Sequence, residues 1–92
     1  MTIVFTEPAR ADLEDIIAYT KLHYPNQLTK LERRITAVIS RIERYPKNAT
    51  GTLQHRDVRV VPLINYPFRI FYREIPGGIE ILHVRHTARN WP

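Results

Sequence analysis

Residues 58–89, VRVVPLINYPFRIFYREIPGGIEILHVRHTAR, decide the fold of this 92-residue chain. The segment contains three short runs rich in β-branched and aromatic residues, separated by residues that form turns. Pro76-Gly77-Gly78 predicts a tight hairpin between the last two runs, because glycine tolerates the dihedral angles of such turns. The segment 62–67 contains two prolines, and proline has no N–H to donate to the hydrogen-bond ladder of a central strand. This segment is therefore expected to be a loop between the first two runs. We therefore expect three consecutive antiparallel strands.

Alternation along these strands separates apolar from cationic side chains, because successive residues point to opposite faces. The apolar set is expected to face the core and comprises Val58, Val60, Phe68, Ile70, Tyr72, Leu82 and Val84. The opposite face then carries Arg59, Arg69, Arg73, His83 and Arg85, with Phe71 and Ile81 among them. The reverse orientation would bury four arginines without partners, at a cost on the order of several kcal/mol per ion. The cationic face is therefore expected to lie away from the core.

The first half of the chain predicts two helices. Thr6 is suited to cap the first helix, whose apolar residues recur at helical spacing until Pro25-Asn26 interrupts them. A cleaner apolar stripe runs from Leu28 to Tyr45. The short apolar run 3–5 predicts one more strand. The expected fold is α+β in the order β-α-α-β-β-β, with the N-terminal strand and a helical hairpin packed on one face of a small antiparallel sheet.

Length and composition restrict the class of protein. Ninety-two residues suffice for one domain, so we expect a single domain over residues 1–92. No run approaches the roughly 20 apolar residues that span a bilayer, and we expect no signal peptide and no membrane partner. The chain has no cysteine, which excludes disulfides and fits a cytoplasmic location. No cofactor is indicated, and a metal site is disfavoured because His83 and His86 would point to opposite faces of one strand.

The formal net charge of +5 is concentrated in the second half of the chain. Residues 1–45 contain seven basic and six acidic side chains, whereas residues 46–92 contain seven basic and three acidic ones. Six of the seven basic residues in the second half are arginine, whose planar guanidinium suits bidentate contact with phosphate or carboxylate. The distribution indicates an anionic partner for the sheet.

Two strand motifs carry a family resemblance. The first is YPFRIFYR over residues 66–73, and the second is IEILHVRHTAR over residues 79–89. With the helical start ARADLEDI over residues 9–16, they resemble the RelE/ParE superfamily of bacterial toxins. The resemblance implies the toxin half of a type II toxin–antitoxin pair. Such a toxin forms a hetero-oligomer with a cognate antitoxin encoded beside it, which neutralises it.

The superfamily contains two mechanisms. RelE-like members cleave messenger RNA on the ribosome, whereas ParE-like members share the fold and inhibit DNA gyrase. RelE-like enzymes tend to carry a lysine-rich segment before the second strand and an arginine or a His-Tyr pair near the end. Here residues 53–57 contain no lysine, and the tail after His86 contains no tyrosine. A gyrase-directed, ParE-like toxin is therefore the leading hypothesis. A ribosome-dependent nuclease is the alternative, and a basic adaptor that keeps the fold only for binding is the third.

Candidate site residues lie on the cationic strand face and near the C-terminus. The expected contacts to an antitoxin or another anionic partner are Arg59, Arg69, Phe71, Arg73, Arg85 and Arg89. For a nuclease, the resemblance implies Arg69 as a phosphate clamp helped by Arg73 and Arg85. The side chain of His83 or His86 would then be the group able to titrate near neutral pH. Phe71 would then stack on a base. A structural role for His86 fits equally well.

Two further features have more than one interpretation. The basic side of the second helix, with Arg33, Arg34, Arg41 and Arg44, predicts a solvated face on which Glu32 and Glu43 offer ion pairs. Contact with nucleic acid or gyrase is the second possibility for that side. Trp91 either folds back onto the sheet or contacts a partner.

Overall fold

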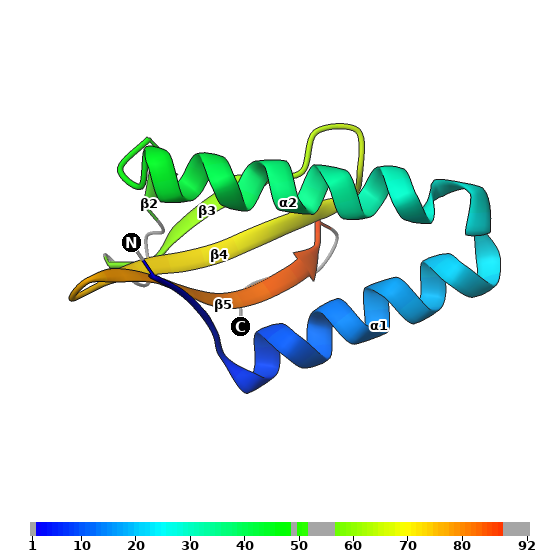
Figure 1. Cartoon of the computed structure of the whole chain (residues 1–92), viewed down its shortest axis with the longest axis horizontal. Helices are drawn as coiled ribbons and strands as arrows, with labels where there is room; N and C mark the ends of the chain where they lie inside the picture. The colour runs from blue at the N-terminus through cyan, green and yellow to red at the C-terminus, as the bar shows by residue number, and fades with distance from the viewer. Residues whose placement is uncertain (1, 49, 52–56, 88–92) are drawn as a thin grey trace.

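The computed structural model describes residues 2–48, 50–51 and 57–87. Its elements are β1 (Thr2–Phe5), α1 (Glu7–His23), the 3-10 turn η1 (Pro25–Gln27), α2 (Leu28–Arg44), β2 (Thr50–Gly51), β3 (Arg59–Pro62), β4 (Phe68–Ile75) and β5 (Gly78–His86). The helices meet at η1 and diverge from there, so that α1 runs beside β5 and α2 runs along the length of the molecule (Figure 1). In the described part of the chain, neither α1 nor α2 has the length and hydropathy of a membrane-spanning helix.

The strands form one sheet in the order β1-β5-β4-β3-β2. Pairing is antiparallel except between β1 and β5, which run parallel. The α+β class and the element order predicted from the sequence are confirmed. The parallel edge strand β1 and the short β2 extend the predicted antiparallel core of β3, β4 and β5 into a mixed sheet.

The hairpin between β4 and β5 turns at Pro76 and Gly77, as the sequence predicts. Gly77 has a φ of 76°, a conformation that glycine adopts without strain. Gly78 opens β5 directly opposite Thr2, and a Cβ atom there would collide with the carbonyl oxygen of Thr2. Both glycines are therefore required, one by backbone conformation and the other by the close approach of β1.

The core lies between the helical hairpin and one face of the sheet. Its buried members are Ala9, Ile16, Leu31, Ile35, Val38, Ile42, Leu63, Ile70, Tyr72, Ile79, Ile81 and Val84. Tyr72 is fully buried, and its hydroxyl donates a 2.6 Å hydrogen bond to the carbonyl oxygen of Pro46, just beyond α2. This bond ties the middle of the sheet to the end of the helix.

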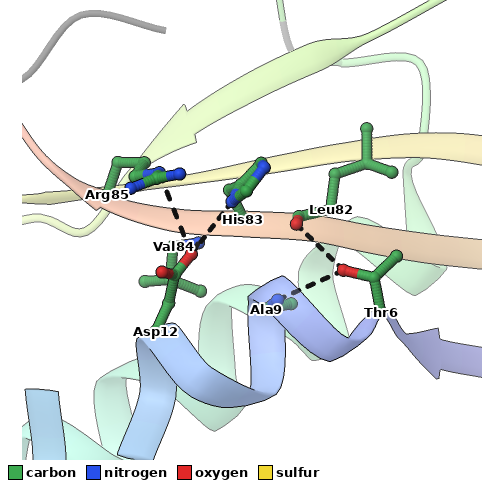
Figure 2. Close-up of polar contacts among 7 residues, drawn as sticks. All are labelled: Thr6, Ala9, Asp12, Leu82, His83, Val84 and Arg85. Atoms are coloured by element: carbon green, nitrogen blue, oxygen red, sulfur yellow. Dashed lines mark hydrogen bonds and ion pairs between the residues drawn. The ribbon is translucent and has the colours of Figure 1, made fainter. Parts of the chain in front are cut away.

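A β-bulge in β5 changes which residues face the core. Phe71 is opposite His83, whereas the next residue, Tyr72, is opposite Ile81, so Leu82 is the extra residue. The prediction that Leu82 faces the core and that Ile81 joins the cations is wrong. Ile81 is fully buried in the core, and the side chain of Leu82 points away from α1 (Figure 2). Strict alternation fails here because the inserted residue reverses the phase of the strand.

The register of β3 corrects a second assignment. Arg59 lies opposite Tyr72, and Val60 lies opposite Phe71, so each shares the sheet face of its partner. The prediction that Val58 and Val60 face the core while Arg59 lies with the other arginines is therefore wrong. Arg59 is on the helix side, where its Nη1 donates a 3.3 Å hydrogen bond to the carbonyl oxygen of Lys47. Val58 is buried outside the core cluster. Since both faces of β3 carry valine, its own pattern does not determine its orientation.

Candidate functional site

Arg69 on β4 and Arg85 on β5 lie directly opposite each other in the antiparallel ladder. Both point to the sheet face away from the core, since their neighbours Ile70 and Val84 belong to the core cluster. Like charges in directly opposed positions destabilise a sheet. The fold gains no stability from placing these two arginines together, so they are the leading candidates for contact with an anion.

Arg73 shares this face but is engaged within the fold. Its Nε donates a 2.8 Å hydrogen bond to Oε1 of Glu80, and its Nη1 lies 3.6 Å from Oδ2 of Asp57. The hydrogen bond to Glu80, together with the charges of Glu80 and Asp57, raises the pKa of Arg73. An incoming anion would have to compete with these two carboxylates for Arg73.

Phe71 lies between the cations along β4. The guanidinium carbon of Arg69 is 5.6 Å from the centroid of the Phe71 ring, a cation–π arrangement. Phe71 is only 2% exposed. It therefore supports the aliphatic and cationic side chains of this face and does not present an open ring on which a base could stack.

Asp12 on α1 links the helix to the cationic strand, a contact that sequence reasoning missed. Its Oδ2 accepts a 3.0 Å hydrogen bond from the backbone N–H of Val84 and lies 3.1 Å from Nδ1 of His83. The same oxygen is 4.0 Å from Nε of Arg85 (Figure 2). The carboxylate therefore orients His83 and places a negative charge beside Arg85.

The start of α1 explains how Asp12 reaches the sheet. The Oγ1 of Thr6 accepts from the N–H of Ala9 and donates a 3.0 Å hydrogen bond to the carbonyl oxygen of Leu82 (Figure 2). The predicted cap is thus confirmed, and it also anchors the helix to β5. Pairing of β1 with β5 ends at Phe5 and Ile81, and α1 continues along the same strand edge. The only sequence signal for this contact was the position of Asp12 in the second turn of the helix.

His86 lies apart from the other candidate residues. It is opposite Phe68, and their rings make an edge-to-face contact with centroids 5.6 Å apart. Phe68 packs against the core cluster, so His86 is on the helix side of the sheet and His83 is on the opposite side. The structure therefore places His83 on the sheet face of Arg69 and Arg85, whereas His86 is on the other face. Arg89 and Trp91 lie outside the described residues.

A groove of about 840 Å³ lies between the helical hairpin and the ends of β4 and β5. Its lining includes Asp12, Tyr19, Tyr24, Phe68, Arg85 and His86. At the tip of the hairpin Leu22 is 77% exposed, and Tyr19 and Tyr24 are each 57% exposed. Exposed apolar side chains gathered beside a groove are typical of a protein-binding surface. The sequence analysis treated the apolar residues before Pro25 as one helical stripe and so missed this surface.

Two comparisons with known proteins return a match. A family model described as the ParE toxin of the type II toxin–antitoxin system parDE matches residues 3–91. A solved structure described as the chromosomal ParDE TA system from P. aeruginosa superposes with a TM-score of 0.78 at 23% identity, covering 94% of this chain and 95% of that one. A search of curated proteins finds no match. The resemblance inferred from the strand motifs is confirmed. Since the family model spans nearly the whole sequence, the chain belongs to the ParE toxin family of type II toxin–antitoxin systems.

Proposed function

We propose that this toxin arrests bacterial growth inside the cell by inhibiting DNA gyrase, and that a ParD-like antitoxin holds it inactive. The observation that carries the proposal is the match of the ParE family model over residues 3–91. The solved relative is likewise described as a ParDE system, and its fold covers almost all of this chain. Inhibition of gyrase is what the ParE-like side of the resemblance implies.

The antitoxin is expected to use two adjoining surfaces. Its apolar residues would occupy the groove beside Tyr19 and Tyr24, because water contact with these rings is unfavourable. Acidic residues of the same segment would reach Arg85, which lines the groove and lies opposite Arg69 in the sheet. Such a segment would neutralise the opposed arginines that the fold leaves side by side.

The sequence-based list of binding residues changes accordingly. Arg69, Arg85 and the supporting Phe71 remain as one site on the sheet, with Arg73 beside it. Arg59 is assigned to a different surface because it lies on the helix side and bonds to Lys47.

A gyrase assay tests the proposal directly. The purified toxin should inhibit DNA supercoiling by gyrase with no ribosome present, and addition of the antitoxin should restore supercoiling. Arg69→Ala should weaken the affinity for the antitoxin at least tenfold, as expected for loss of a charge-assisted contact. Arg10→Ala, which removes an exposed arginine on α1, should leave that affinity unchanged. Normal supercoiling at a large excess of toxin would contradict the proposal.

One observation favours the alternative, a ribosome-dependent nuclease. His83 is oriented by the Asp12 carboxylate and shares a sheet face with Arg69 and Arg85, so an oriented titratable group lies near two cations. This alternative predicts transcript cleavage in a translation extract that is lost in His83→Gln and retained in His86→Gln, since His86 lies on the other side of the sheet. Harmless expression without any antitoxin would instead favour the third hypothesis, a binding adaptor.

A further inference from the structure

Helix α2 carries a line of positive charge that the proposed function does not use. The cationic ridge consists of Lys30, Arg33, Arg34, Arg41 and Arg44. At 100° per residue these five side chains fall within an arc of about 100° on the solvent side of the helix. The buried residues of α2 occupy another arc, which faces the core. Four of the five cations are exposed, and Arg34 is half-buried.

The acidic residues of α2 do not neutralise the ridge. Sequence reasoning expected Glu32 and Glu43 to form ion pairs with it, but neither is three or four residues from any of the five cations. In the part of the chain that the structure describes, no ion pair involves a ridge residue. Conversely, Lys30 is three and four residues from Arg33 and Arg34, spacings at which like charges repel. The expectation that Glu32 and Glu43 pair with the ridge is therefore wrong.

The helix dipole does not account for the ridge either. Arg41 and Arg44 lie in the last turn, where positive charge is favourable. Lys30 lies in the first turn, which has no acidic residue, and Arg33 and Arg34 follow in the next turn. Positive charge near a helix N-terminus is unfavourable. The N-terminal half of the ridge thus destabilises the helix. The stability of the fold therefore does not account for its positive charge, which favours contact with a partner.

The chemistry of the ridge fits a phosphate backbone better than a protein. Ala37 is the only uncharged residue of α2 within the arc. Protein interfaces are depleted of charge at their centres, whereas the ridge is charged along its whole length. The ridge runs roughly 21 Å along the helix, at 1.5 Å per residue. Duplex DNA presents one charge per about 1.7 Å of its axis, whereas an extended peptide of acidic residues presents at most one per about 3.3 Å.

We propose that the cationic ridge of α2 binds the phosphodiester backbone of duplex DNA without sequence preference. Helix α2, which carries the ridge, runs along the length of the molecule (Figure 1). Four of the ridge's five cations are exposed, so a duplex can reach them. This inference does not depend on gyrase being the target, because the contact requires only the toxin and DNA.

The test measures binding of the purified full-length toxin to a fluorescent 20-base-pair duplex as salt is raised. The logarithm of the binding constant falls with the logarithm of the salt concentration, with a slope of about −0.9 per phosphate contact. With five contacts, the binding constant should therefore fall roughly 500-fold between 50 and 200 mM salt. The triple variant Lys30→Gln/Arg33→Gln/Arg34→Gln should lose only roughly 12-fold over that range, because about two contacts remain. Its thermal stability should equal or exceed that of the wild type, since unfavourable charges are removed.

A matched control removes the same amount of charge elsewhere. The variant Arg10→Gln/Lys21→Gln/Lys47→Gln changes three exposed cations outside the ridge and should keep the wild-type salt slope. Arg33→Lys/Arg34→Lys should bind within about threefold of the wild type, because a lysine also contacts phosphate as a point charge. Equal losses in the two triple variants would overturn the proposal, as would binding of a 20-residue oligoglutamate as tight as that of the duplex. If DNA binding fails while supercoiling is still inhibited, the inference is wrong and the proposed function stands.

Discussion

Removing the Asp12 carboxylate should destabilise the fold by an amount that the geometry sets. In Asp12→Ala the N–H of Val84 loses a 3.0 Å hydrogen bond to a charged acceptor, a contribution of about 1.5–3 kcal/mol. The 3.1 Å contact with His83 is lost as well. The contact with Arg85 contributes little, because it is 4.0 Å long. The Asp12 side chain is 17% exposed, so water compensates part of the loss, and we expect about 2–3 kcal/mol.

Asp15→Ala is the matched control. Asp15 lies on the same helix with an exposed side chain, and both substitutions gain the same helix propensity of alanine. The control should stay within about 0.5 kcal/mol of the wild type. Asp12→Asn should fall between the two, because an amide oxygen still accepts a hydrogen bond but carries no charge.

Urea denaturation monitored by circular dichroism measures these differences in the free energy of unfolding. In thermal denaturation of a domain of this size, Asp12→Ala should lower the Tm by roughly 10–20 °C. Hydrogen exchange at the Val84 amide should also accelerate more than exchange at the core strand positions, because the strand edge loses its acceptor. If Asp12→Ala and Asp15→Ala prove equally stable, Asp12 does not hold α1 against β5, and the account given for this edge is wrong.

Three further predictions test the sheet. Ile81→Ala should lower the free energy of unfolding by about 2–5 kcal/mol in chemical denaturation, because Ile81 is fully buried. Leu82→Ala should lower it clearly less, and the reverse order would contradict the bulge. Gly78→Ala should destabilise by about 1–3 kcal/mol, as its Cβ meets the Thr2 carbonyl, and an unchanged Tm would show that β1 does not pair there. Tyr72→Phe should cost about 1 kcal/mol in the same denaturation assay through loss of its hydrogen bond to Pro46, and no change would argue against that bond.

Much of the fold follows from local sequence patterns. Thr6 predicts the helix start because its hydroxyl satisfies a free N–H, and Pro76-Gly77 predicts the hairpin because few other residues adopt the turn. The stripe from Leu31 to Ile42 predicts a buried helix face through its period alone. The alternation of Arg69 with Ile70 predicts a cationic face opposite the core. In each case, residues that are neighbours in the sequence are sufficient to determine the local structure.

The candidate site depended on contacts between distant residues. Sequence alone determined the family, the two helices, the strands other than β2, the net charge and a cationic face on β4 and β5. Tertiary structure alone decided that Leu82 is an extra residue in β5, that Arg59 turns to the helix side, and that Asp12 reaches His83 across 71 positions of the chain. Strand register is set by the partner strand and the helix above it, and a shift of one residue moves every side chain to the other face. No local pattern contains that information, because the atoms that determine it belong to other segments of the chain.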